Sequence, residues 1–272
     1  MGFTPLRTTF EAGSKAFGFW LCLPTAAGAK TILRSAASIS GGFSWVLVDA
    51  EHGLITDKDY YELVNAIAAE GASPIIRVPW NEEWMIKRAL DAGAHGVLTP
   101  MCHTPVDAER IVKFSKYPPS GSRGYGPMLA SHTLPIAQGG AVYDASADKN
   151  LLVMVQIESK SGVDHVEEIA KVEGLDVLLI GPFDLAKQLN VTHGGQEHEA
   201  AITRILKGAK SAGKIAAIFC TSGAQARARL EQGFDMVSVI PDLNVLGDGM
   251  AHELKIASGD GSNVVKQQKD SY

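Results

Sequence analysis

Eight short apolar segments recur along the chain, and each of them ends at a polar or turn residue. Segments that are apolar throughout and alternate with amphipathic helices are typical of a parallel sheet whose faces are covered by helices. This alternation is the feature that most constrains the fold. The apolar segments comprise residues 17–23, 45–49, 73–79, 96–101, 151–158, 176–182, 214–220 and 236–240.

The intervening segments have the period of amphipathic helices, and most of them close on Gly, as helices often do at their C-terminal end. Eight strand–helix units in about 250 residues predict a (β/α)8 TIM barrel. A doubly wound open sheet is the alternative, but no GxGxxG motif follows the first strand. The helical segments comprise residues 55–71, 81–93, 104–116, 162–174, 198–213 and 223–233.

We expect one barrel domain over residues 1–258. Residues 117–150 are rich in Gly, Pro and Ser and have little periodicity, which predicts a long loop with a functional role or high mobility. Residues 259–272 are polar and predict a frayed C-terminal tail.

The composition argues against several classes of partner. A net charge of -5 gives no electrostatic reason to bind nucleic acid or an anionic membrane. No apolar stretch of about 18 residues is present, and the first residues contain no apolar signal core. The three cysteines lie far apart without CxxC spacing, which fits a reducing compartment. We therefore expect a cytoplasmic protein.

Carboxylates follow two neighbouring predicted strands, at the ends where barrel enzymes place their active sites. Gln156 and Glu158 end the fifth strand on the same face, and Asp184 follows the sixth. Two carboxylates so close repel each other unless a proton or a cation lies between them. Mg²⁺ and similar ions are commonly held by one or two carboxylates, with water and substrate as the other ligands. Either Glu158 and Asp184 hold such a metal, or Glu158 pairs with Arg77.

The segment after the sixth strand suggests an anion site. Gly181 and Pro182 turn the chain, and a helix is predicted to begin at Phe183 or Asp184. N–H groups at a helix N-terminus bind anions, so a substrate carboxylate could lie there. The alternative is an ordinary strand-to-helix turn with an Asp near the N-cap.

Further polar residues end the second and third strands. Asp49 and Glu51 share a face, and His52 follows them. A histidine with a pKa near neutrality is suited to general base catalysis when another group orients it, and Asp91 could do so. A lone histidine is nevertheless more often structural. Arg77 interrupts an apolar strand and requires an anionic partner. It either forms a structural ion pair or holds an enolate or a carboxylate of the substrate.

Taken in order, several segments resemble the signature segments of the HpcH/HpaI aldolase family. This family comprises metal-dependent class II pyruvate aldolases such as 4-hydroxy-2-oxoheptanedioate aldolase and 2-dehydro-3-deoxyglucarate aldolase, with macrophomate synthase as a fungal relative. The resemblance runs from about residue 17 to 245 and implies a barrel of the phosphoenolpyruvate/pyruvate-binding type. It also implies a hexamer whose C-terminal helices exchange between neighbours. The segments are WVLVDAEHG, PIIRVPWN, IKRALDAGAHGVLTPM, YPPSGSRGYG, VMVQIES and LLIGPFDLA.

The resemblance also implies a metal and a binding site for the oxo acid. Glu158 and Asp184 would hold Mg²⁺, Mn²⁺ or Co²⁺. Gln156 would assist at the bound oxo acid, and backbone amides from Gly181 to Asp184, around Pro182 and Phe183, would take its carboxylate.

The remaining roles implied by the resemblance concern the enolate and the proton. Arg77 would stabilise the enolate oxygen, and His52, paired with Asp91, would act as acid and base. Asp49 and Glu51 would support this substrate site.

The expected function is cleavage of a 4-hydroxy-2-oxo acid to pyruvate and an aldehyde through a metal-stabilised enolate. Alternatives are an oxaloacetate decarboxylase, a C–C bond-forming enzyme similar to macrophomate synthase, and a catalytically silent ligand-binding barrel. The chain departs from the family pattern at the bulky Phe183, in the 126–150 insert with His132 and Tyr143, and in IFCTSG after the seventh strand. We expect these segments to shape the aldehyde side of the pocket.

Overall fold

Eight parallel strands form a closed barrel in the computed structural model, which describes residues 4–39, 42–134 and 140–259. Because β1 pairs with both β2 and β8, the sheet has no free edge. The predicted barrel is therefore confirmed, and the open sheet is wrong. The strands are β1 Ala16–Leu21, β2 Trp45–Asp49, β3 Ser73–Arg77, β4 Gly96–Thr99, β5 Leu152–Ile157, β6 Val177–Ile180, β7 Ile215–Ile218 and β8 Met236–Pro241.

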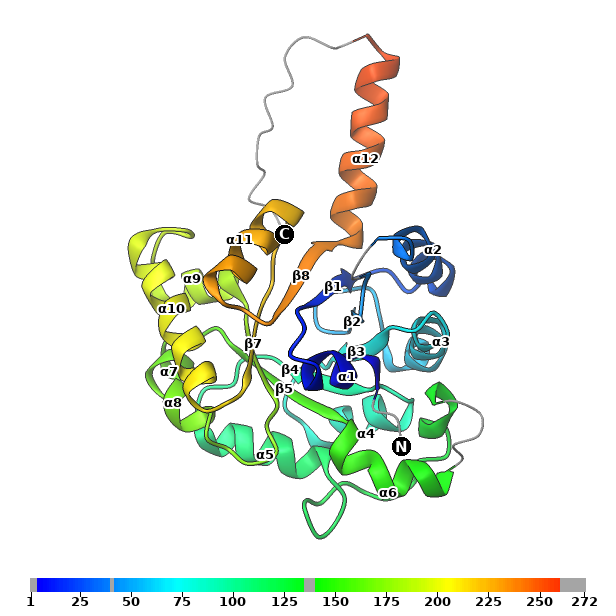
Figure 1. The fold of residues 1–272 in the computed structure, drawn as a ribbon, viewed down its shortest axis with the longest axis vertical. Helices are drawn as coiled ribbons and strands as arrows, with labels where there is room; N and C mark the ends of the chain where they lie inside the picture. Colours follow the sequence, from blue (N-terminus) through cyan, green and yellow to red (C-terminus); the bar gives the residue numbers. More distant parts are fainter. Residues whose placement is uncertain (1–3, 40–41, 135–139, 260–272) are drawn as a thin grey trace.

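Helices surround the barrel (Figure 1). All six predicted helical segments contain helix, although 162–174 holds two short ones, α7 and α8, in place of one. The helices α1, α2, α6 and α12 were not predicted, and the helix expected to begin at Phe183 or Asp184 is α9, which begins at Pro182. The helices are α1 Pro5–Glu11, α2 Ala26–Ala36, α3 Asp57–Ala68, α4 Glu83–Asp91, α5 Pro105–Ser115, α6 Gly140–Asn150, α7 Lys160–Asp164, α8 Val166–Ile169, α9 Pro182–Leu189, α10 Gln196–Ser211, α11 Gly223–Gln232 and α12 Asp242–Ala257, with a 3-10 turn at Ala130–Thr133.

The alternation of side chains along each strand fills the barrel with layers of apolar residues. On β2, Trp45 and Leu47 point into the interior cluster, and two residues later Asp49 lies at the C-terminal end of the strand. On β3, Ile75 lies in the same cluster and Arg77 follows it. The layer of the interior at the C-terminal ends of the strands, which we call the mouth of the barrel, is therefore polar.

The opposite, N-terminal end of the barrel is closed by α1. Leu6 is fully buried in the interior cluster, and its backbone N–H donates to Ser73 Oγ at the start of β3. Arg7 forms an ion pair with Asp176, which directly precedes β6. The site therefore has to lie at the other end, where the strands finish.

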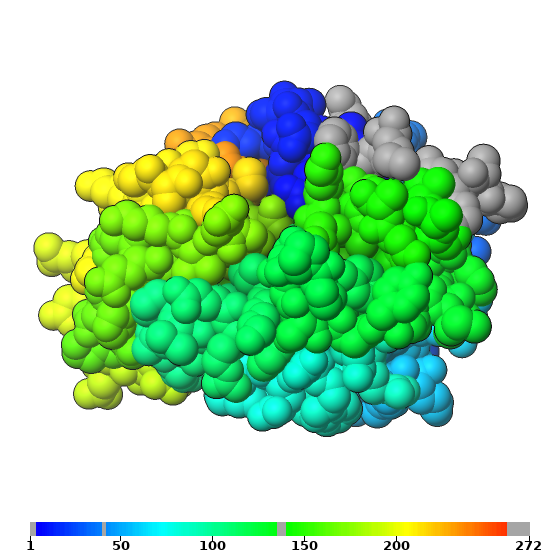
Figure 2. Space-filling view, turned by 90° about the horizontal axis from the view of Figure 1, so that it is seen from below, coloured from blue at the N-terminus to red at the C-terminus, as the bar shows by residue number. Residues whose placement is uncertain are grey.

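The sequence predicts a loop over 117–150, but the described part of this segment, 117–134 and 140–150, contains the helix α6. Tyr143, Ser146 and Ala147 of α6 are buried, but its polar and apolar residues are too mixed to give a clear helical period. Tyr143 lines a small cavity with Thr4 and His95, at the N-terminal end of the barrel. In Figure 2 the blue N-terminal segment lies against the green part of the chain that contains α6. The expectation that this insert shapes the aldehyde side of the pocket is therefore wrong for Tyr143.

The last helix, α12, follows β8 and projects away from the barrel (Figure 1). No described helix is long and apolar enough to cross a membrane. Of the predicted tail, residues 260–272 lie outside the described part of the chain. Apolar side chains along α12 are exposed, namely Leu243, Val245, Leu246, Met250, Leu254 and Ile256.

Candidate active site

A buried ion pair between Asp49 and Arg77 forms the floor of the mouth. The two residues are register partners on β2 and β3. Arg77 Nε and Nη2 donate to the two carboxylate oxygens of Asp49 at 2.9 and 2.6 Å. Asp49 Oδ1 also accepts from the backbone N–H groups of Glu51 and His52. Because Asp49 is fully buried and both oxygens are used, we assign it a positioning role and not the substrate contact that the sequence suggests.

The rest of the Arg77 guanidinium faces the mouth. Its Nη1 lies 2.9 Å from Glu51 Oε2 and donates to Gln156 Oε1 at 3.3 Å. Burial raises the pKa of Glu51, and the charge of Arg77 opposes that rise. Arg77 thus has its anionic partners in Asp49 and Glu51, which speaks against the alternative in which it exists to pair with Glu158.

Glu158 places a carboxylate directly after the apolar strand β5, and two hydrogen bonds hold this group. Its Oε1 accepts from the backbone N–H of Met101 at 3.0 Å, and its Oε2 accepts from Gln156 Nε2 at 2.7 Å. These two bonds do not compensate its burial: desolvation raises the pKa of Glu158 to about 8, and the charge of Asp184 adds to the rise. The predicted common face of Gln156 and Glu158 is confirmed by their hydrogen bond.

Asp184 enters the same region from α9, whose N-cap is Gly181. Its charge raises the pKa of both Glu158 and Glu51. Gly181 is required here because a Cβ at this position would lie 2.0 Å from Glu158 Oε2. The absence of a side chain lets the start of α9 approach the end of β5.

The residues present fit a hard divalent cation. Within the described residues no group of three or more His, Cys, Asp and Glu side chains is arranged around a metal position. Mg²⁺, however, is usually bound through one or two carboxylates, with waters and substrate oxygens completing its shell. Glu158 and Asp184 supply such a pair. Burial raises the pKa of Glu158 more than the hydrogen bond from Met101 and the charge of Arg77 lower it, and a cation beside the carboxylate would favour its ionised form.

His52 lies at the rim of the mouth, where half of its side chain is exposed. Its Nε2 is 3.7 Å from Glu51 Oε1. Asp91 is not its partner: Asp91 accepts from Arg123 at 2.6 Å. The reason is geometric, because a helix of a barrel runs back along its strand, and Asp91 is the last residue of α4. It therefore lies towards the N-terminal end, and the expected pairing of His52 with Asp91 within one chain is wrong.

The structure adds Trp20 and Met101 to the predicted site residues. A pocket is lined by Gln156, Gly181, Pro182, Phe183 and Asp184, as expected, and also by Trp20 of β1 and Phe219 directly after β7. Phe219 lies in the IFCTSG segment, which we expected to shape the pocket, whereas Trp20 was not predicted. Met101 has a left-handed backbone with φ 52°, and no pattern in the sequence indicates this. His132, in contrast, contacts Tyr61 of α3.

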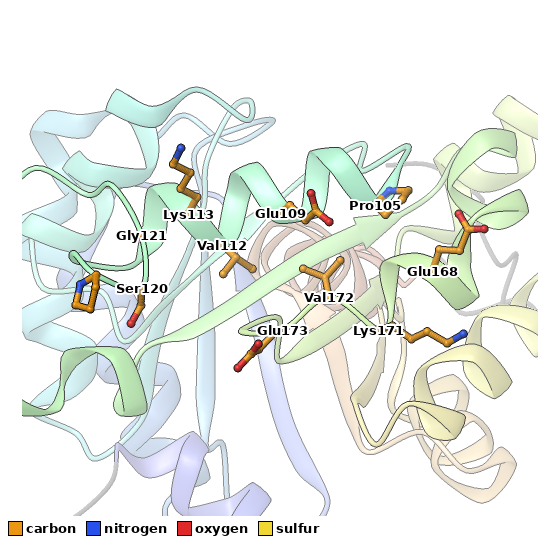
Figure 3. Close-up of a pocket in the computed structure, with 11 residues that line it drawn as sticks. Pro105, Glu109, Val112, Lys113, Ser120, Gly121, Glu168, Lys171, Val172 and Glu173 are labelled. Carbon is orange, nitrogen blue, oxygen red and sulfur yellow. The ribbon is translucent and has the colours of Figure 1, made fainter.

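A larger groove, of about 540 Å³, lies on the outer surface between α5 and α8 (Figure 3). Glu109 and Lys113 of α5 line it on one side, and Lys171 and Glu173, which follow α8, line it on the other. Its charges are of both signs and lie outside the barrel, so we do not assign it to the reaction.

Comparison with known proteins agrees with this geometry. The family model of the HpcH/HpaI aldolase/citrate lyase family matches residues 21–247. The chain is 33% identical over 245 residues to the hydroxypyruvate/pyruvate aldolase of Rhizorhabdus wittichii, covering 89% of this chain and 93% of that protein. It is 38% identical over 208 residues to the 5-keto-4-deoxy-D-glucarate aldolase of Shigella boydii, covering 75% and 79%.

A solved structure gives the same result. The HpcH/HpaI aldolase/citrate lyase family protein from Burkholderia cenocepacia superposes with a TM-score of 0.84 at 32% identity, covering 94% of this chain and 99% of that one. The buried carboxylates, the clamped arginine and the closed barrel thus occur together with a family match over most of the chain. The chain belongs to the HpcH/HpaI aldolase/citrate lyase family.

Proposed function

We propose that this chain is a class II pyruvate aldolase that cleaves a 4-hydroxy-2-oxo acid to pyruvate and an aldehyde. The observation that carries the proposal is the buried carboxylate Glu158, whose pKa is raised to about 8 while Asp184 lies in the same mouth. Glu158 and Asp184 would hold Mg²⁺, Mn²⁺ or Co²⁺. When bound, such an ion supplies Lewis-acid stabilisation of the negative charge that develops on the oxo acid.

The protein supplies a second positive charge through Arg77. Asp49 holds two of its nitrogens, so the guanidinium is fixed before substrate arrives. Fixed donors stabilise developing charge without reorganisation during the reaction. We assign Arg77 Nη1 to the enolate oxygen of pyruvate, with Gln156 beside it.

The carboxylate of the oxo acid is assigned to the first turn of α9. The N–H groups of a first turn are not used within the helix, and the positive end of the helix dipole favours an anion. Because Pro182 has no N–H, the amides of Phe183 and Asp184 are the donors in this turn.

Cleavage also requires a base for the 4-hydroxyl proton. We assign this role to His52, which lies at the rim with Glu51 at 3.7 Å. The base removes the hydroxyl proton, the bond between C3 and C4 breaks, and its electrons pass into the pyruvate enolate. A proton then returns to C3 and completes pyruvate. Asp91 is not included, because Arg123 engages it.

Oxaloacetate decarboxylation is a second candidate reaction of the same site. Loss of CO₂ leaves the same enolate, but no hydroxyl proton has to be removed. This reaction needs Glu158, Asp184 and Arg77, and it does not need the half-exposed His52.

The test is pyruvate release from 4-hydroxy-2-oxo acids and from oxaloacetate, measured with and without EDTA. We expect EDTA to abolish turnover and Mg²⁺ or Mn²⁺ to restore it. Glu158→Gln should be inactive at all metal concentrations, whereas Glu109→Gln, on the outer helix α5, serves as a matched control with normal turnover. Undiminished turnover in EDTA would refute the metal assignment.

The chain is also proposed to form a homo-oligomer, which the resemblance makes a hexamer with exchanged C-terminal helices. The support is α12, where Met250 and Leu254 are 68% and 69% exposed. Apolar side chains exposed in a row along one helix favour contact with a second protein surface.

A cytoplasmic location is proposed from the three cysteines, which are spaced without a pairing pattern.

A further inference from the structure

A fully buried histidine, His198, is bonded to the start of α9. It belongs to the first turn of α10, and its side chain is 0% exposed. Its Nε2 lies 2.8 Å from the carbonyl oxygen of Pro182, and its Nδ1 lies 3.0 Å from the backbone nitrogen of Gly194. None of the roles assigned above to site residues involves this side chain.

The two partners of His198 fix the protonation state of its ring. A carbonyl oxygen only accepts and a backbone N–H only donates, so Nε2 carries the proton and Nδ1 is the acceptor. A second proton on the ring would remove the bond from Gly194. Burial lowers the pKa of His198, which agrees with a neutral ring. Glu199 lies 4.0 Å from Nδ1, and Arg229 engages its carboxylate at 2.6 and 2.7 Å.

The bond to Pro182 acts on the peptide group that this residue shares with Phe183. A trans peptide group is planar, so its C=O and its N–H point in opposite directions. With the oxygen held by His198, the N–H of Phe183 is directed to the other side of the group. This N–H is one of the two donors assigned to the carboxylate of the oxo acid. A hydrogen bond at the carbonyl also polarises the peptide group and strengthens its N–H as a donor.

The bond from Gly194 gives His198 a second connection to the same residue. Gly194, with φ 72°, follows His193, whose ring stacks on that of Phe183 with centroids 4.5 Å apart and planes 9° apart. A histidine that only anchored this loop would act on the ring of Phe183 and not on its backbone. The two bonds use different ring nitrogens, so substitutions can remove them one at a time.

We infer that His198 is a positioning residue, which orients the Pro182–Phe183 peptide through its Nε2–H so that the Phe183 N–H binds the carboxylate of the oxo acid. The inference rests on the proposed function and extends its substrate site to the first turn of α10. Pyruvate carries its carboxylate both before and after the methyl group loses a proton. The contact therefore stabilises the bound substrate and the transition state alike, and weakening it should raise KM and leave kcat nearly unchanged.

The experiment follows the exchange of the pyruvate methyl hydrogens with D₂O by NMR at saturating Mg²⁺, and it gives kcat and KM for pyruvate in each variant. His198→Gln places an amide NH₂ near the position of Nε2 and keeps a donor for Pro182. His198→Asn places a carbonyl oxygen near the position of Nδ1 and keeps only the acceptor for Gly194.

His198→Asn should raise the KM for pyruvate about tenfold, as expected when one hydrogen bond to a charged group is weakened, whereas His198→Gln should stay within about threefold of the wild type. In both variants kcat should change less than about threefold. His198→Ala removes both bonds, should match His198→Asn, and replaces it if that variant does not fold. His95→Asn, at a buried histidine just before β4, is the matched control and should keep the wild-type KM.

Two results would overturn the inference: an unchanged KM in the variant that lacks the donor for Pro182, or the same KM in that variant and in His198→Gln. Either result, in a wild type that exchanges the methyl hydrogens, refutes the role of His198 alone. Absence of exchange in the wild type refutes pyruvate enolisation, and the proposed function and this inference fail together.

Discussion

Replacing Glu158 by Gln should remove a specific pH dependence of stability. Burial raises the pKa of Glu158 from its ordinary value of 4.5 to about 8 in the folded, metal-free protein. Between these two values the folded state keeps a proton that the unfolded chain has released. Stability rises with pH only where the unfolded state binds more protons, so here the free energy of unfolding falls as pH increases.

The magnitude follows from the width of this window. One pH unit corresponds to ~1.36 kcal/mol, so the interval from 4.5 to about 8 corresponds to a contribution on the order of 5 kcal/mol for a side chain that is 2% exposed. That contribution is fully present below pH 4.5 and is lost by about pH 8. The amide that Glu158→Gln introduces cannot ionise, so the variant lacks this decline.

The assay is urea-induced unfolding in EDTA from pH 4 to pH 9 at constant protein concentration. We expect the difference in free energy of unfolding between wild type and Glu158→Gln to change by about 5 kcal/mol across the series, with the variant relatively more stable at pH 9. Glu109→Gln, an exposed residue, should follow the wild type. Parallel curves for wild type and Glu158→Gln would refute the reasoning.

Added Mg²⁺ should oppose the fall in the free energy of unfolding over this pH range. A cation binds the ionised carboxylate, so its affinity rises with pH. At 100 times its Kd, a ligand that binds only the folded state adds ~2.7 kcal/mol. Mg²⁺ should therefore flatten the wild-type decline above pH 7 and leave Glu158→Gln unchanged.

Three further outcomes follow from the site and from α12. His52→Ala should slow aldol cleavage about 10² to 10⁴-fold yet spare oxaloacetate decarboxylation, and equal losses in the two assays would remove its role as base. Met101→Val should weaken Mn²⁺ binding in calorimetry, because a β-branched residue resists the φ of 52° at which the N–H reaches Glu158. Met101→Gly should bind Mn²⁺ within a few-fold of wild type, since Gly adopts positive φ freely. Leu246→Glu on α12, where the side chain is 56% exposed, should reduce the molar mass measured by light scattering if α12 mediates assembly.

The sequence alone determined the barrel and much of the mouth. In-out alternation is a local property of a strand, so Gln156 and Glu158 had to share a face once β5 was recognised. The same rule places Arg77 in the interior at the C-terminal ends of the strands, where it forms ion pairs with Asp49 and Glu51. The family resemblance likewise depends on residues that are adjacent in the chain.

The tertiary structure decided which segments that are distant in the sequence lie close together. His52 and Asp91 stand at the ends of different elements, and only the return direction of α4 shows that they lie towards opposite ends of the barrel. Helix α6 has too little periodicity to be recognised, because its burial depends on Tyr143 meeting Arg123. The pocket brings together Trp20 of β1, Phe183 of α9 and Phe219 directly after β7. Contacts of this kind arise from closure of the barrel, and closure is a property of all eight strands together that no single segment encodes.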